Sequence, residues 1–288
     1  LFTSGSNGKL TNINLSSVSF EIEPLKNFVV QAGFSYRTLE SASKTFSLDY
    51  YTTLPTIANP AGIVESKVIQ SEANIQFEFM PNRKTIGFGV ERDLVDSPFS
   101  HFFINFSYGL KGVLKSDFAY EKVQLYYKQP IVIGPLGRSN IILETGKTFG
   151  TIPLGLMSVI PGNQTYFTID NTFSNLNFYE FISDEYVTLQ WNHDFGGRLF
   201  ARIPFMRKLN WREFVGVKSV YGTISGANRE INASGLPYNA PEKVYWEYNA
   251  GIGNIFKVFR IDFSWRGNYL NTPDASKFAV KGSFGFYF

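Results

Sequence analysis

Few residues in this sequence could carry out covalent chemistry, so each candidate can be weighed separately. The chain has no cysteine and only two histidines, His101 and His193. His193 stands beside Asp194 in WNHDF, but neighbours on a strand point to opposite faces, which predicts no catalytic dyad. His193 is expected on the lipid-facing side. His101 is followed by Asn105 and Ser107, at a spacing that does not fit a hydrolase site. We therefore expect no catalytic residue and no enzyme.

Binding of metals, cofactors and nucleic acids also finds no support in the sequence. Metal sites combine cysteine, histidine and carboxylate ligands at short spacing, and no such cluster occurs. The formal net charge of +3 argues against nucleic acid as a partner. No run of about 18 apolar residues exists, which excludes a membrane-spanning helix. We therefore expect no metal, no cofactor and no nucleic-acid partner.

The positions of the polar residues depend on the strands that carry them. In SKFAVKGSFGFYF, the last stretch of the sequence, strand periodicity separates two faces. One face is apolar: Phe278, Val280, Phe284, Phe286, Phe288. The other face is small, polar or basic, and includes Lys281 and Ser283. Outer-membrane barrels commonly end on an aromatic residue, so Phe284, Phe286 and Phe288 are predicted to form a C-terminal assembly signal.

The same alternation recurs along the chain and leaves two fold classes open. A soluble sandwich would bury the apolar face, whereas a membrane barrel would turn it toward lipid. The segments are about 9–13 residues long, which suits tilted membrane-spanning strands better than soluble ones. Tyrosine and tryptophan also lie near many strand ends, as in aromatic girdles. The prediction is an all-β, transmembrane antiparallel β-barrel, located in the bacterial outer membrane and bounded by lipid.

Counting back from the end predicts eleven crossing strands. Their ranges are 12–23, 28–38, 66–79, 101–110, 117–130, 139–149, 186–195, 211–223, 243–253, 258–268 and the final strand. The stretch 80–100 could hold a twelfth strand, but alternating directions favour an elaborate turn there. Single-chain bacterial barrels have even strand numbers. Residues 1–288 are therefore predicted to be one barrel domain, the C-terminal portion of a longer chain and barrel.

Three groups of residues are the candidate functional sites. The segment 150–185 is long, has no lysine or arginine, and is predicted to pack in the lumen or against a partner: Pro161, Gly162, Asn163, Gln164, Tyr166, Phe167. The charges opposite the apolar faces are predicted to line the lumen: Glu72, Glu78, Glu144, Lys218, Glu247, Arg260, Asp262, Arg266, Lys281. Cross-strand pairing explains these charges, and a selectivity lining or a contact for an inward loop is the alternative.

The third group is a basic turn predicted on the periplasmic side. It contains Arg202, Arg207, Lys208 and Arg212, and it could grip anionic lipid headgroups or a periplasmic partner. A plain solvated turn is the alternative interpretation.

Several stretches together resemble one protein family. They include GLKGVLKSDF (109–118), PGNQTYF (161–167), NFYEFISDEYVTL (177–189), IPFMRKLNWRE (203–213) and GIGNIFKVFRIDF (251–263). They are similar to large outer-membrane proteins of the Bacteroidota in which a carboxypeptidase-like regulatory domain precedes a barrel domain of unknown function. The resemblance begins near residue 12 and implies a barrel without peptidase activity.

A more distant resemblance is to the outer-membrane assembly-factor superfamily, also called bacterial surface antigens. Its barrels have sixteen strands, of which five follow a long loop that folds into the lumen. The resemblance implies a component of an outer-membrane protein or lipoprotein biogenesis or export complex, with other outer-membrane or periplasmic proteins as partners. The superfamily's Arg-Gly loop motif is missing from 150–185, so no arginine of that loop can lock onto a lumen carboxylate. The alternatives are a structural or receptor subunit of an uptake or secretion complex, or a passive pore.

Overall fold

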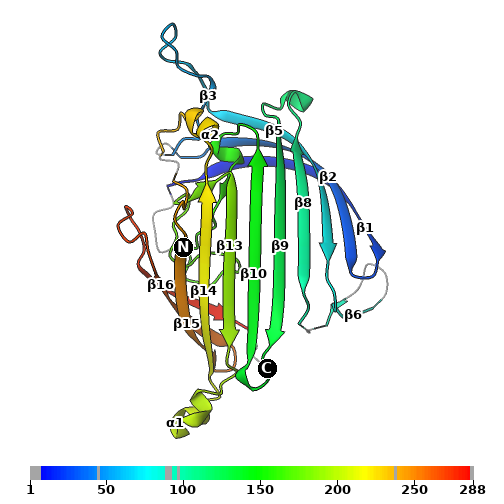
Figure 1. Cartoon of the computed structure of the whole chain (residues 1–288), viewed down its shortest axis with the longest axis vertical. Coiled ribbons are helices and arrows are strands. Elements are labelled where there is room, and N and C mark those ends of the chain that lie inside the picture. Colours follow the sequence, from blue (N-terminus) through cyan, green and yellow to red (C-terminus); the bar gives the residue numbers. More distant parts are fainter. Residues whose placement is uncertain (1–7, 44–45, 88–92, 96–97, 237–238, 286–288) are drawn as a thin grey trace.

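The fold is dominated by one large antiparallel sheet, shown in the computed structural model of Figure 1. The structure describes residues 8–43, 46–87, 93–95, 98–236 and 239–285. The sheet has 11 strands, and neighbours in the sheet follow one another along the chain apart from short intervening elements. In sheet order the strands are β1 (Thr11–Leu25), β2 (Phe28–Ser41), β5 (Lys67–Phe79), β8 (His101–Gly109), β9 (Tyr120–Val132), β10 (Arg138–Phe149), β13 (Glu185–Asp194), β14 (Arg212–Thr223), β15 (Tyr245–Ile255), β16 (Phe259–Arg266) and β17 (Phe278–Phe284).

The eleven predicted strands are confirmed, with boundaries that differ by only a few residues. The stretch 80–100, which could have held a twelfth strand, contributes only the two-residue pair β6 (Thr85–Ile86) and β7 (Asp93–Leu94), outside the large sheet. The remaining short elements are β3 (Tyr50–Thr53), β4 (Ile63–Glu65), β11 (Ser158–Val159), β12 (Ile182–Ser183), α1 (Pro204–Arg207), α2 (Gly226–Glu230), η1 (Val113–Lys115), η2 (Gly134–Leu136), η3 (Leu154–Leu156) and η4 (Phe200–Arg202).

The connections fall into two classes, one at each end of the sheet. At the lower end in Figure 1, which we call the turn end, β1–β2, β9–β10 and β15–β16 are joined by tight turns. Asn27 closes the first with a left-handed φ of 64°. Gly137 closes the second with φ 112°, and a Cβ there would lie 2.0 Å from the carbonyl oxygen of Asp194. At the opposite, long-loop end, the chain makes its long excursions between β2 and β5, β10 and β13, and β14 and β15.

The two faces of the sheet differ as strand alternation predicts. On β13, for example, Leu189 and Trp191 are 47% and 37% exposed, whereas Thr188 and Gln190 on the other face are buried. Aromatic rings run along the outer face of the last strands, where Tyr248 and Trp265 stack with centroids 5.4 Å apart. On β13 the outer face is therefore apolar and accessible, and the inner face is polar and covered. In the described residues, no helix is long and apolar enough to cross a membrane.

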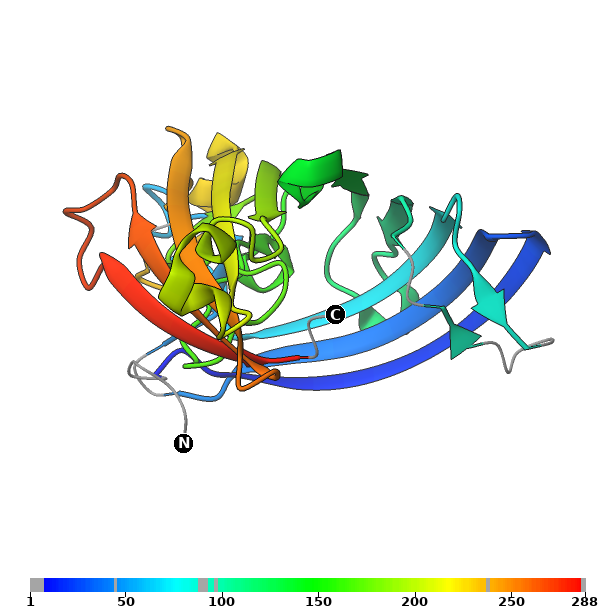
Figure 2. The same cartoon turned by 90° about the horizontal axis from the view of Figure 1, so that it is seen from below.

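The buried core lies inside the curve of the sheet, not between two stacked sheets. Figure 2 shows the sheet wrapping around an inner chain segment near its late strands. One core cluster unites Leu39 and Val68 of the sheet with Tyr50, Leu154 and Ile224 at the long-loop end. A second unites Phe173, Leu176 and Phe181 with Val220 and Tyr245 of the sheet.

The sheet is curved but not closed within the described residues. β1 and β17 stand at opposite ends of the strand order, and no pairing joins them. β1 is exposed on both faces along nearly its whole length.

Candidate functional site in the interior of the sheet

The segment between β10 and β13, residues 150–184, is the best candidate for function, and we call it the inner loop. It enters through η3, pairs with itself through β11 and β12, and returns to β13. Its apolar side chains Phe173 and Leu176 are fully or almost fully buried against the inner face of the sheet. The inner loop is therefore packed inside the curve, which is one of the two positions its composition predicted.

A carboxylate of the sheet receives the middle of the inner loop. Glu247 on β15 is 2% exposed. Its two oxygens accept the backbone N–H groups of Ser174 at 2.7 Å and Asn175 at 3.0 Å. The Tyr245 hydroxyl donates to the same carboxylate at 3.1 Å. A charged acceptor bound by several N–H and O–H donors makes strong hydrogen bonds, so Glu247 fixes the loop backbone at this point.

An arginine of the sheet holds the next part of the inner loop. Nη2 of Arg266 lies 2.6 Å from Oε1 of Glu180, and both side chains are almost completely buried. Nη1 of the same guanidinium donates to the carbonyl oxygen of Asn175 at 3.2 Å. The guanidinium also lies over the Tyr245 ring, 5.0 Å from its centroid. The buried ion pair and the hydrogen bonds of the guanidinium therefore attach the loop to β16.

Two lysines of the sheet bind backbone carbonyl groups of the inner loop. Nζ of Lys218 donates to the carbonyl oxygen of Thr172 at 2.6 Å. Nζ of Lys281 donates to that of Asn163 at 2.8 Å and also to that of Thr165. Together with Glu247 and Arg266, these residues form what we call the wall anchors, supplied by β14, β15, β16 and β17.

The wall anchors include an ion pair whose charges are exchanged relative to the pair of loop arginine and lumen carboxylate that the sequence excluded. The inner loop has no arginine to offer, as the sequence shows. Instead, the sheet supplies the cation in Arg266 and the loop supplies the carboxylate in Glu180. Glu180 was missed at the sequence level, although the lack of basic residues in the loop and the basic inner faces of the late strands pointed toward this arrangement.

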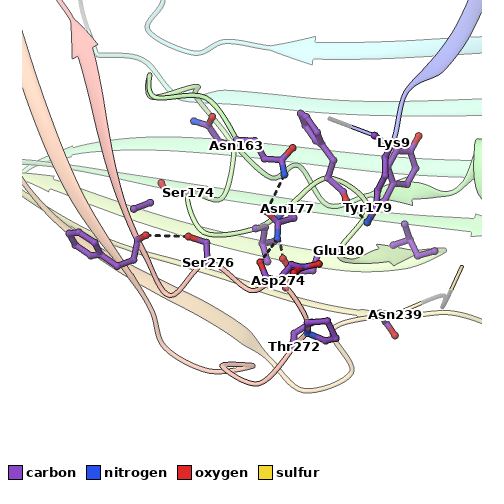
Figure 3. Close-up of a pocket in the computed structure, with 18 of the residues that line it drawn as sticks. Lys9, Asn163, Ser174, Asn177, Tyr179, Glu180, Asn239, Thr272, Asp274 and Ser276 are labelled. Carbon is purple, nitrogen blue, oxygen red and sulfur yellow. Dashed lines mark hydrogen bonds between the residues drawn. The ribbon is translucent and has the colours of Figure 1, made fainter. Parts of the chain in front are cut away.

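The predicted residues Pro161, Gly162, Asn163, Gln164, Tyr166 and Phe167 differ in exposure, with Pro161 exposed and Gln164 half-buried. Gly162 and Asn163 are buried, and a Cβ at Gly162 would lie 2.3 Å from the carbonyl oxygen of Leu176. Tyr166 and Phe167 are 53% and 39% exposed. This part of the loop lies beside a cavity of about 1020 Å³, drawn in Figure 3 with Asn163, Asn177, Glu180 and Asp274 along it.

The remaining predicted lumen charges bind neighbouring side chains on the sheet. Glu72 pairs with Arg37 at 3.3 Å, and Glu78 lies 3.4 Å from Nε2 of His101. Glu144 accepts the Tyr186 hydroxyl at 2.7 Å. Arg260 pairs with Asp262 on the same strand at 2.6 Å. These contacts are the cross-strand and same-face pairs expected of a polar interior.

The long-loop end holds one further buried polar cluster, which sequence reasoning missed. Oδ2 of Asp184 accepts Nδ2 of Asn228 at 2.7 Å, and Oδ1 of Asn228 accepts the backbone N–H of Ile152 at 2.8 Å. Nearby, Tyr50 is buried and donates to the carbonyl oxygen of Lys67 at 3.2 Å. Burial and the neighbouring carboxylate of Asp117 raise the pKa of the Tyr50 hydroxyl.

The basic turn is only partly a free surface. Arg202, Arg207 and Lys208 lie in or next to η4 and α1 and are exposed. Arg212 begins β14 and pairs with Asp194 at 2.6 Å. The fourth predicted member is therefore engaged on the sheet, away from the exposed three.

The predicted C-terminal signal is described only at Phe284, which is 71% exposed and whose ring packs 5.1 Å from that of Phe259. Phe286 and Phe288 lie outside the described residues.

His193 lies on the same face of β13 as Trp191, on which it stacks, but it is covered and does not reach the outer surface. The ring is 6% exposed, because the turn between β9 and β10 covers it. Nδ1 lies 2.8 Å from the Ser139 hydroxyl, and Nε2 lies 2.9 Å from the carbonyl oxygen of Leu136. Asp194 points to the other face, toward Arg212. In the described residues no group of three or more histidines and carboxylates could hold a metal ion.

Several solved structures align with this chain. The structure aligns with BamA from Haemophilus ducreyi lacking POTRA domains 1-3, with TM-score 0.56 and 11% identity, over 96% of this chain and 55% of that one. CdiB from Acinetobacter baumannii aligns with TM-score 0.43 and 11% identity over 97% and 51% of the two chains. OccK11 (OpdR) from Pseudomonas aeruginosa aligns with TM-score 0.33 and 8% identity over 98% and 73%.

The likeness to BamA shows the fold, an antiparallel β-barrel sheet, and the chain spans about half the length of that structure. No curated protein matches the chain. A family model does match, over residues 16–234, and its description is a family of unknown function (DUF5686), C-terminal domain. That match includes eight of the eleven strands wholly or in part, from β1 to β14, and the whole inner loop. The chain therefore belongs to the DUF5686 family and carries its C-terminal domain.

Proposed function

We propose that this protein is an outer-membrane β-barrel whose lumen is obstructed by its own inner loop, and that it acts in a complex that assembles or exports outer-membrane proteins or lipoproteins. It is neither an enzyme nor a passive pore in this proposal. The resemblance to Bacteroidota proteins adds a regulatory domain before the barrel. The proposal rests above all on one observation, the wall anchors that bind the inner loop inside the sheet.

The outer-membrane location is supported by the chemistry of the outer face. Aromatic and aliphatic side chains occupy it on strand after strand, and many are 37–50% exposed, for example Leu189, Trp246 and Tyr248. In water such a continuous apolar surface is unfavourable, whereas in a bilayer it is the surface that lipid solvates. The strand lengths, up to 15 residues in β1, suffice for tilted crossings.

The interior of the sheet argues against a passive pore. A diffusion channel needs an open, water-filled lumen lined by side chains that face solvent. Here Glu247, Arg266 and Lys281 are 2%, 5% and 3% exposed, since the inner loop covers them. Their charges hold a chain segment and are not available to passing ions.

The assembly role is tested with the full-length protein, tagged and extracted gently from native membranes. Mass spectrometry of the co-purified proteins should find the outer-membrane assembly machinery or unfolded barrel clients. The protein carrying Arg266→Met provides a matched sample in which the loop is loosened. Recovery of the protein alone, or with uptake or secretion partners only, contradicts the assembly role.

The closed lumen is tested separately by conductance in planar bilayers. The wild-type protein should conduct little, and a variant with residues 163–177 replaced by a short Gly-Ser linker should conduct severalfold more. A wild-type protein that conducts as well as the linker variant contradicts the loop's proposed role as an obstruction.

A second candidate function is a structural or receptor subunit of an uptake or secretion complex. One observation favours it: the hairpin of β3 and β4 protrudes from the long-loop end (Figure 1) and carries exposed apolar residues, with Ile57 fully exposed and Ile63 51% exposed. Exposed apolar side chains on a projecting hairpin suit contact with a partner protein. Loss of a co-purified uptake partner on Ile57→Asp, with the membrane level unchanged, would favour this alternative.

A further inference from the structure

The turn end of the sheet carries exposed cations without exposed acids. The turns of β9–β10, β13–β14 and β15–β16 follow one another there in the order of the sheet. Residues 130–138, 195–211 and 252–261 contain no aspartate or glutamate. Of the acids that flank the middle stretch, Asp194 pairs with Arg212 and Glu213 is 7% exposed. The three stretches hold six exposed cations, which we call the basic rim: Arg138, Arg198, Arg202, Arg207, Lys208 and Lys257.

The cations of the basic rim lack the partners that exposed cations have at the other end of the sheet. Within the described part of the chain, none of the six side chains forms an ion pair or a hydrogen bond. At the long-loop end, three exposed cations each lie 2.6–2.8 Å from a glutamate: Lys67 with Glu40, Lys147 with Glu185, and Arg229 with Glu242. The charges of the basic rim are therefore available to an anion from outside the chain.

Exposed apolar side chains stand among these cations in each of the three turns. Leu136, Phe205 and Phe256 are 60%, 77% and 90% exposed. Within residues 198–209, RLFARIPFMRKL, four of the cations are interleaved with apolar residues. Segments that mix cations with exposed aromatic and aliphatic side chains lie in the interface of anionic bilayers, where the apolar groups reach the acyl boundary. The composition of the basic rim therefore suits a lipid surface.

Strand length places these turns at the level of the lipid headgroups. β13 has 10 residues, and a tilted strand of about 9–11 residues just spans the hydrocarbon core. Trp191, 37% exposed on the outer face, lies near the turn end of that strand, where interfacial aromatic residues belong. The turn that follows Asp194 therefore begins where the hydrocarbon ends, and the basic rim continues the apolar outer face.

The middle turn is held in one shape, so that its cations are presented together. The backbone N–H of Phe200 donates to the carboxylate of Glu213, and the rings of Phe200 and Trp211 pack 6.5 Å apart. Gly197 has a left-handed φ of 80°, and a Cβ there would lie 2.8 Å from the carbonyl oxygen of Trp211. Figure 1 shows α1 of this turn projecting beyond the ends of the strands. A preorganised turn loses little conformational freedom on binding.

We propose that the basic rim binds the anionic headgroups of the phospholipid leaflet that surrounds the turn end of the barrel. The guanidinium and ammonium groups bind headgroup phosphates through charge-assisted hydrogen bonds. Phe205 and Phe256 insert beside them at the acyl boundary. The inference rests on the proposed outer-membrane location, and it does not depend on the role in assembly or export.

The first test measures which lipids the full-length protein retains. The protein is mixed with detergent micelles that contain phosphatidylglycerol and phosphatidylcholine in equal amounts, and native mass spectrometry counts the lipids that stay bound. The wild type should retain the anionic phosphatidylglycerol in preference. A triple variant of the rim, Arg202→Gln with Arg207→Gln and Lys208→Gln, should lower that preference by about fivefold for each cation removed.

The matched control removes three cations from the long-loop end: Lys67→Gln with Lys147→Gln and Arg229→Gln. Its net charge changes by the same amount, but these side chains already pair with glutamates, so it should keep the wild-type preference. Equal losses in the two triple variants, or a wild type without preference, would overturn the proposal. Soluble glycerol phosphate in excess should not displace the bound lipid, and complete displacement would also overturn it.

The second test separates the lipid site from the membrane location and from a protein partner. The wild type and both triple variants are reconstituted into vesicles of the same two lipids, and insertion is measured as resistance to extraction by urea. All three should insert. A wild type that does not insert would contradict the outer-membrane location, whereas insertion without lipid preference would overturn only the role of the rim. Loss of a co-purified acidic protein from the rim variant, with its lipid preference unchanged, would assign the surface to that protein and overturn the proposal.

Discussion

Two strands from opposite parts of the sheet, β1 and β15, share one sequence pattern and have opposite surroundings. β1 and β15 both alternate apolar with polar residues. Yet Glu21 on β1 is exposed, whereas Glu247 on β15 is 2% exposed and bound by four donor groups. The difference comes from the inner loop, which among the described residues lies against the late strands and touches β1 only at its start, through Tyr179 and Thr11 (Figure 2). A strand's alternation thus sets which side chains face inward, and the loop decides whether those side chains are solvated or structural.

The largest effect on this difference between covered and open strands is expected from a substitution at the buried ion pair of Arg266 and Glu180. Arg266→Met removes the guanidinium and leaves Glu180 buried without its cation, so the protein should lose about 3–5 kcal/mol of stability. Thermal unfolding followed by circular dichroism in detergent measures the loss.

The double variant Arg266→Met with Glu180→Met is the control for that prediction. Because it leaves no unpaired buried charge, it should be more stable than Arg266→Met alone. Equal stability of the single variant and the wild type would show that the pair does not hold the loop.

A matched pair of carboxylate substitutions sharpens the comparison between covered and open positions. Glu247→Gln should cost about 1.5–3 kcal/mol, because the neutral amide loses charge-assisted bonds to the backbone of the inner loop. Glu78→Gln, at a carboxylate whose side chain is 24% exposed and faces His101, should cost less than about 1 kcal/mol. Similar costs for the two, measured as shifts in melting temperature, would count against the loop as the cause of the difference.

The long-loop end should weaken at high pH through Tyr50. The folded state raises the pKa of its hydroxyl, so on alkalinisation the unfolded chain, with a tyrosine pKa of about 10, loses this proton first. The stabilisation is complete below that pH and declines as pH rises above it. Melting curves between pH 8 and 11 should show a steeper decline for the wild type than for Tyr50→Phe. Tyr51→Phe, at the next residue, should keep the wild-type slope.

The smallest effect is expected at an ion pair outside the inner loop's reach. Lys147 and Glu185 lie 2.8 Å apart, but their side chains are 47% and 52% exposed. Solvent screening leaves such a pair with about 0–1 kcal/mol. Lys147→Met should therefore leave the melting temperature almost unchanged, and a large drop would mean that exposed and covered pairs contribute alike.

The strands could be predicted from the sequence because alternation is local. For example, a strand and its outer face can be predicted from four alternating apolar residues alone: Phe259, Ile261, Phe263 and Trp265. The inner loop was recognisable for a similar reason, since its length, its aromatics and its lack of basic residues are all composition. The inward charges Lys218, Arg266 and Lys281 could be placed on a face, and the structure shows the carbonyl and carboxylate groups that each one meets.

The other contacts of the inner loop could not be predicted from the sequence. They join residues far apart in the chain, or they use backbone groups that every residue has. Arg266 and Glu180 are 86 residues apart, and no spacing rule connects them. The bridge between Phe167 and Gly282 uses backbone N–H and C=O groups, which side-chain types do not reveal. Strand alternation predicted the face of His193 but not its burial, because the turn that covers it belongs to another hairpin.

The shared core at the long-loop end has a consequence for how the exposed surface can vary during evolution. Phe46, Leu48 and Tyr50 from one loop pack with Ile152 and Leu154 from a second and Ile224 from a third. Backbone bonds also join Tyr51 to Ile231 and Ala233 to Asp49. These loops therefore form one composite surface at the long-loop end. Hypervariation of one loop therefore requires compensating changes in the other two, so relatives should exchange them as a linked block.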